Sequence, residues 1–158
     1  NKPAEREAQG FTYYRYDRID PGLLPSLYLA YHNALSEPTE TFHNDIRSRY
    51  ECGETEVIEA MQHLAALTVR GHQALLNGDA AELAKLIDEN FNTRRSIYKL
   101  PPWQLKMIKT ARDCGASAKF AGSGGAIIGI YRDEAMFNEI SERMAQIGSK
   151  TIKPIIVD

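Results

Sequence analysis

The sequence predicts an α+β fold: a ferredoxin-like split βαβ sandwich with extra helices in its first crossover. Two observations lead to this class. Short apolar or aromatic segments of strand length alternate with longer segments of helical periodicity, and glycines and prolines mark the boundaries between them. The order is strand, three helices, strand, glycine loop, strand, helix, strand, and its core is β-α-β-β-α-β.

The N-terminal part of the chain predicts two strands and a loop. Residues 1–20 are expected to be an N-terminal linker remnant, in which the aromatic segment 11–19 is a candidate edge strand. Residues 21–158 form the expected domain. Its first strand is the apolar segment 27–32, and the polar residues 36–44 that follow are predicted to be a loop.

Three helices come next. Apolar residues recur with helical spacing over residues 54–77, and Gly78 supplies a left-handed C-cap. Asp79 then caps a second helix, with an acidic residue three positions later as in a capping box, and this helix extends towards Tyr98. A third helix over residues 103–114 follows two prolines, the second of which suits a first helical position.

The C-terminal part of the chain completes the sheet. Residues 117–120 and 126–131 are predicted strands separated by a glycine loop. Asp133 caps a fourth helix that ends at Gly148. The last strand is predicted over residues 152–157, at an edge or end of the sheet, because it contains a proline that cannot donate a ladder hydrogen bond.

Composition excludes several functions. A net charge of −2 argues against a general nucleic-acid binder, and no apolar run approaches the ~18 residues of a membrane-spanning helix. Cys52 and Cys114 form no CxxC motif and have no histidine at ligand spacing. We therefore expect no metal site, no nucleic-acid or membrane partner, and a reduced, cytoplasmic setting.

The glycine loop Gly122-Ser123-Gly124-Gly125, with Lys119 before it, is the first candidate site. Glycine permits positive φ and close approach to a ligand, and successive N–H groups in such a turn bind anions. A plain glycine-rich β-hairpin would show the same sequence. Because residues 94–119 carry seven Lys or Arg and one Asp, we expect the anion in this region.

Three arginines are candidates for binding a phosphate or carboxylate, since a guanidinium binds such groups bidentately. Arg94 and Arg95 are neighbours late in the second predicted helix, where successive side chains point about 100° apart. At most one of them therefore faces a given pocket. Taken alone, both are better explained as ordinary cations near a helix C-terminus, where the helix dipole favours positive charge. Arg47, in the polar segment 42–49 after the first domain strand, is the third candidate, and this segment would also suit a solvated helix start.

The glycine loop lies in a longer stretch, GASAKFAGSGGA at residues 115–126, that resembles the third conserved motif of the GHMP small-molecule kinases. In that family the motif belongs to a C-terminal domain with a split βαβ core. The segments NFNTRRS (90–96), ALLNGD (74–79) and HNDIRSR (43–49) are similar to the glucuronokinase-like branch of sugar kinases. The resemblance covers residues 25–157.

This resemblance implies the C-terminal domain of a kinase that transfers the γ-phosphoryl group of ATP to a hydroxyl of a sugar or sugar acid. The glycine loop and Lys119 would border the phosphoryl-transfer site, and Arg94, Arg95 or Arg47 would bind the acceptor. ATP and Mg²⁺ would be bound by the intact enzyme, and this chain alone is expected to bind neither of them tightly.

The family's ATP-binding motif P-x-x-x-G-L-x-S-S-A has no match here, and neither has its catalytic Asp. We therefore expect no catalytic residue in this chain, no activity of the chain alone, and a missing N-terminal kinase domain as its partner; a homo-oligomer is left open. One alternative is a stand-alone ferredoxin-like module that binds an anionic metabolite for regulation. Another is an interaction domain without a ligand.

Overall fold

A four-stranded antiparallel sheet forms the centre of the computed structural model, which describes residues 5–8, 11–14, 18–32, 39–122 and 124–156. Side chains are described from residue 18 onward, apart from those of residues 39–44. The strands are β3 (Leu27–His32), β4 (Lys119–Phe120), β5 (Ala126–Ile130) and β6 (Ser149–Ile152), in the order β4-β5-β3-β6. In this order the first and third core strands lie in the middle of the sheet, which confirms the predicted split βαβ topology.

The register of the sheet is set by the central strand β3. Leu27 lies opposite Ile130 and Tyr31 opposite Ala126 on one side, and His32 lies opposite Ser149 on the other. Alternate residues of β3 are buried, as expected for a sheet covered on one face.

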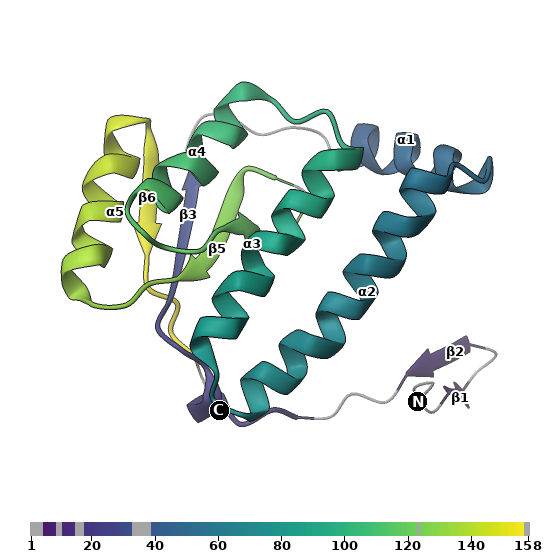
Figure 1. Ribbon diagram of the computed structural model, residues 1–158, viewed down its shortest axis with the longest axis horizontal. Helices are drawn as coiled ribbons and strands as arrows, with labels where there is room; N and C mark the ends of the chain where they lie inside the picture. Colours follow the sequence, from purple (N-terminus) through teal and green to yellow (C-terminus); the bar gives the residue numbers. More distant parts are fainter. Residues whose placement is uncertain (1–4, 9–10, 15–17, 33–38, 123, 157–158) are drawn as a thin grey trace.

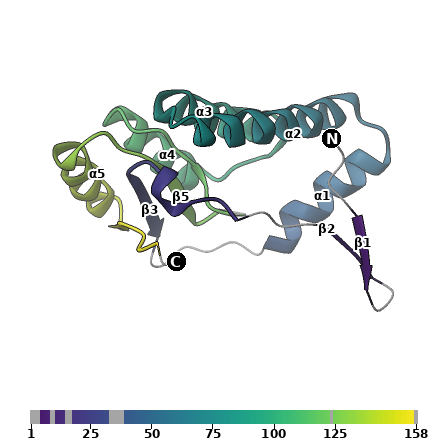
Figure 2. The ribbon, with the colours of Figure 1, turned by 90° about the horizontal axis from the view of Figure 1, so that it is seen from below.

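Five helices accompany the sheet in the described part of the chain (Figure 1): α1 (Thr39–Glu51), α2 (Thr55–Leu76), α3 (Ala80–Ile97), α4 (Pro102–Asp113) and α5 (Glu134–Gln146). Helices α3, α4 and α5 supply the side chains that pack on the sheet, and Figure 2 shows the helices gathered on one side of it. The core joins Tyr28, Phe91, Met107, Ile127 and Ile140, all nearly inaccessible to solvent.

The helix boundaries follow the predicted caps. The Asp79 carboxylate accepts a hydrogen bond from the backbone N–H of Glu82 at 2.9 Å, and Asp133 accepts one from Met136 at 2.9 Å. Gly78 has a φ of 66°, so it provides the turn between α2 and α3. These two helices pack side by side as the predicted helical pair.

The predicted loop over residues 36–44 is wrong for residues 39–44, which begin helix α1. Residues beyond the helix contribute to the contacts that stabilise α1. Ile46 is buried against Val57 and Ile97, and Arg49 donates to the carbonyl of Ile97 at 2.7 Å. A helix held by tertiary contacts need not show strong local signals.

The last strand is also displaced. It runs over Ser149–Ile152 as β6, not over residues 152–157, because Gly148 reverses the chain immediately after α5 with a φ of 77°. The predicted strand is therefore wrong for residues 153–156, where Pro154 cannot donate a ladder hydrogen bond, and residue 157 lies outside the described residues.

At the N-terminus, the strand predicted over residues 11–19 is found as β2 (Phe11–Tyr14), which pairs with β1 (Glu5–Ala8) in a separate two-stranded sheet. Residues 18 and 19 are not in a strand, and residues 15–17 lie outside the described residues. Strand β1 lies within the residues expected to be a linker remnant and was not predicted.

Candidate functional site

The glycine loop connects β4 to β5, where the end of β3 also lies. Gly122, Gly124 and Gly125 have φ values of 101°, 142° and 81°, as predicted for this loop. The backbone N–H of His32 donates to the carbonyl of Gly125 at 3.0 Å, which ties the loop to β3. Ser123, the fourth loop residue named from the sequence, lies outside the described residues.

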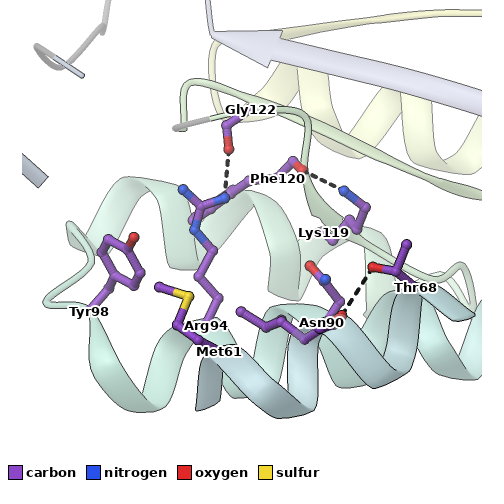
Figure 3. A pocket seen from close by; sticks show the side chains of 10 residues that line it. Met61, Thr68, Asn90, Arg94, Tyr98, Lys119, Phe120 and Gly122 are labelled. Carbon is purple, nitrogen blue, oxygen red and sulfur yellow. Dashed lines mark hydrogen bonds between the residues drawn. The ribbon is translucent and has the colours of Figure 1, made fainter. Parts of the chain in front are cut away.

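An open cavity of about 570 Å³ lies beside the loop, between α2, α3 and β4 (Figure 3). Helix α2 contributes Met61 and Thr68, α3 contributes Asn90 and Arg94, and β4 contributes Lys119. None of the described residues that line this cavity is an Asp or a Glu. The cavity therefore carries positive charge without a carboxylate on its wall to neutralise it.

Arg94 connects the last turn of α3 to the glycine loop. Its Nη1 donates to the carbonyl oxygen of Gly122 at 2.7 Å. The guanidinium carbon lies 5.1 Å from the ring centre of Tyr98 and 5.6 Å from that of Phe120. These two aromatic contacts and the hydrogen bond hold the guanidinium at the cavity. A guanidinium has five N–H donors, so the bond to Gly122 uses only a part of its donor capacity.

Lys119 is the second cation of the cavity. Its Nζ donates to the carbonyl of Phe120 at 3.1 Å. Burial lowers the pKa of Lys119, and the nearby positive charge of Arg94 lowers it further. A negative charge bound between the two cations would raise the pKa of Lys119 again, because it would stabilise the ammonium group.

The other sequence candidates lie elsewhere. Arg95 is exposed and lines a second hollow of about 490 Å³ between α3 and α4, so the two neighbouring arginines face different cavities. The side chain of Arg47 on α1 is 78% exposed and lies 3.9 Å from the carboxylate of Glu51. Arg47 is not part of the described wall of the Arg94 cavity.

The basic stretch over residues 94–119 does not form one anion site. Arg112 is paired with Asp88 of α3 at 2.9 Å, and Lys109 is paired with Asp113. The pair of Arg112 and Asp88 also fixes the backbone just before β4, because Asp88 accepts a hydrogen bond from the backbone N–H of Ala118 at 2.8 Å. Of the seven basic residues in this stretch, Arg94 and Lys119 alone belong to the described wall of the cavity beside the loop.

Two residues near the loop carry no role in the sequence analysis. Asn90 lies on the cavity wall, four residues before Arg94 on the same face of α3. Gln104, in the first turn of α4, is buried beside Gly124. A signal for Gln104 exists in the sequence, because it occupies the same helical face as the buried residues Ile108 and Ala111.

The fold and the glycine loop define the class of protein. The chain belongs to the GHMP kinase C-terminal family: the family described as GHMP kinases C terminal matches residues 72–150, which is half of the chain. The stretch matched includes α3, α4, the glycine loop and α5.

Among individual proteins, the chain is 37% identical over 116 residues to probable glucuronokinase 2 of Arabidopsis thaliana, covering 72% of this chain and 31% of that protein. It is 31% identical over 143 residues to glucuronokinase 1 of the same plant, covering 89% and 39%. The chain thus spans about a third of the length of these relatives.

Among solved structures, L. major mevalonate kinase in complex with R-mevalonate superposes with a TM-score of 0.75 at 16% identity, over 97% of this chain and 49% of that one. This likeness bears on the fold. No helix in the part of the chain that the structure describes is both long and apolar enough to cross a membrane.

Proposed function

We propose that this domain is the C-terminal part of an ATP-dependent kinase that phosphorylates a hydroxyl group of a sugar or sugar acid. The observation that carries the proposal is the pair of cations, Arg94 and Lys119, on a wall beside the glycine loop whose described residues include no carboxylate. The likeness to two glucuronokinases supports a sugar acid as the acceptor.

Each group has a role that its position suits. Phosphoryl transfer depends mainly on positioning and on stabilising negative charge. The positive-φ glycines let the loop backbone approach a transferring phosphoryl group, and Lys119 adds positive potential beside it. Arg94 has N–H donors beyond the one given to Gly122, and a planar guanidinium fits the carboxylate of a sugar acid. Arg95 and Arg47 would act on an acceptor only from outside this cavity.

ATP supplies the phosphoryl group in the intact kinase. The two cations and the loop fit an anionic group of this kind. The described residues contain no group of three His, Cys, Asp or Glu side chains that could hold a metal ion. In this proposal Mg²⁺ is bound by the intact kinase together with ATP. A cytoplasmic location and this N-terminal domain as partner are parts of the same proposal.

The test uses a polypeptide in which this chain follows a GHMP kinase N-terminal domain. ATP-dependent phosphorylation of glucuronate and of neutral sugars is measured for the parent and for Arg94→Met and Arg95→Met. Loss of a charge-assisted hydrogen bond predicts a fall in kcat/KM for the acceptor of about 10- to 100-fold for Arg94→Met. The matched change at Arg95, on the same helix but facing the other hollow, is expected to have little effect.

Equal losses in the two variants would remove Arg94 from the acceptor site, and absence of activity with every sugar would reject the kinase proposal. The 158 residues alone are expected to be inactive, and robust ATP-dependent phosphorylation by them would overturn the two-domain assignment. The stand-alone regulatory module loses support, because the family and both glucuronokinases point to a kinase.

A further inference from the structure

Gln104 is a buried polar side chain that the Arg94 cavity does not use. It lies in the first turn of α4 and is 1% exposed. Its helical face is otherwise built from apolar residues, including Ile108 and Ala111. An amide at such a position is costly unless it is hydrogen-bonded.

Among the described protein groups, neither Nε2 nor Oε1 of Gln104 has a hydrogen-bond partner, although both atoms are inaccessible to solvent. Buried polar atoms in folded proteins are nearly always paired, and the exceptions are often found at functional sites. The amide therefore raises the free energy of this state of the protein, and a conformation that supplied partners would be stabilised.

The amide lies against Gly124 of the glycine loop. A Cβ placed on Gly124 would lie 3.0 Å from Cδ and 3.1 Å from Oε1 of Gln104, and closer still to Nε2. The amide thus occupies the space that a side chain at residue 124 would need. It packs on the buried side of the loop, whereas Gly122 on the same loop is exposed.

The planarity of the peptide group determines where the N–H groups of the loop point when its carbonyls bind Gln104. In a trans peptide the C=O and the N–H point to opposite sides. A loop carbonyl that accepts a hydrogen bond from Nε2 of Gln104 therefore directs the N–H of the same peptide away from the buried side. That direction leads to the solvent side, from which an anionic ligand reaches the loop.

We propose that Gln104 is a positioning residue that holds the glycine loop in the conformation that receives a phosphoryl group. In that conformation its amide exchanges hydrogen bonds with loop peptide groups, and in the anion-free conformation it does not. The proposal rests on the proposed function in one respect, the assignment of an anionic ligand to the loop. It adds a residue of α4, outside the cavity wall, to the groups on which that ligand depends.

The experiment compares the 158-residue chain with Gln104→Met, which keeps the length of the side chain and removes the amide. Gln62→Met on α2 is the matched control, because Gln62 is an exposed glutamine in a helix interior. Inorganic pyrophosphate is the probe. Thermal unfolding is measured without the probe, and amide hydrogen exchange of residues 119–126 is measured over a pyrophosphate titration.

Without pyrophosphate, Gln104→Met is expected to raise Tm by about 2–4 °C, since it removes an unpaired buried amide. With pyrophosphate, the unsubstituted chain and Gln62→Met are expected to show slower exchange in the loop. Gln104→Met is expected to need about tenfold more pyrophosphate for the same protection. The opposite signs of these two effects separate a positioning role from a structural one.

A fall in Tm for Gln104→Met would show that the amide is paired in the anion-free chain, and would overturn the proposal. Equal protection in both chains, or no protection of the unsubstituted loop, would overturn it as well. These outcomes do not depend on the sugar kinase assay. Pyrophosphate protection that requires Gln104, together with no sugar kinase activity, would uphold this inference and reject the proposed function.

Discussion

Substitution of Gly124 by alanine is expected to destabilise the domain through two separable effects. The first is backbone strain, because a φ of 142° is unfavourable for any residue with a Cβ and costs on the order of 1–3 kcal/mol. The second is overlap of the new methyl group with the Gln104 amide, which is too buried to swing into solvent. Overpacking of this kind costs about 1–3 kcal/mol, so the total is about 2–6 kcal/mol.

Gly122→Ala is the matched control. Gly122 also has a positive φ, 101°, but a Cβ there would meet no atom within 4 Å. Its substitution should therefore cost the backbone strain alone, about 1–2 kcal/mol. Urea unfolding of the 158-residue chain, followed by circular dichroism, gives both free energies of unfolding.

A double-mutant cycle isolates the overlap. Gln104→Ala removes the amide, so Gly124→Ala should be less costly in that background, with a coupling free energy of about 1–2 kcal/mol. Equal costs for Gly122→Ala and Gly124→Ala, together with additive effects in the cycle, would refute the packing of Gln104 against the loop.

Three further outcomes follow from single groups. Burial and the charge of Arg94 lower the pKa of Lys119, so the unfolded chain binds the ammonium proton of Lys119 more tightly than the folded chain does. The free energy of unfolding should therefore rise with pH between the lowered pKa and about 10.5. Urea denaturation over a pH series should show this rise for the parent and not for Lys119→Met. Tyr28→Phe removes the donor to the carbonyl of Ser117, a buried bond of 2.9 Å, and should cost about 1–3 kcal/mol of unfolding free energy in the same assay. The helix-capping hydrogen bond from the backbone N–H of Met136 lowers the pKa of Asp133, so Asp133→Ala should lower Tm at neutral pH. The difference should shrink as the pH falls below about 4 and disappear below the lowered pKa of the folded protein, where the parent carboxyl is protonated.

The features predicted well from the sequence are those with local causes. Asp79 and Asp133 act as caps through hydrogen bonds to residues three positions later, and such bonds depend on little beyond the local sequence. The positive φ values of the glycine loop have the same local origin. The sheet order follows from the strand order together with the rules for split βαβ folds.

The features missed depend on contacts between distant segments. Helix α1 is stabilised through Ile46 and through Arg49, whose partner Ile97 lies 48 residues away. The basic stretch looked continuous in sequence, but helical geometry sends Arg94 and Arg95 into different cavities. The contact of Gln104 with Gly124 joins residues 20 positions apart, and no local pattern contains it.

The surroundings of Arg94 have a consequence for how this domain changes in evolution. One guanidinium contacts two rings, Tyr98 and Phe120, and donates to the carbonyl of Gly122. Lysine cannot replace it, because an ammonium group has neither the planar shape nor the forked donors. Loss of either ring would leave the arginine without part of its support. We therefore expect positions 94, 98 and 120 to be inherited as a group, so that sequences of this family that lack the arginine also tend to lack the two aromatic residues.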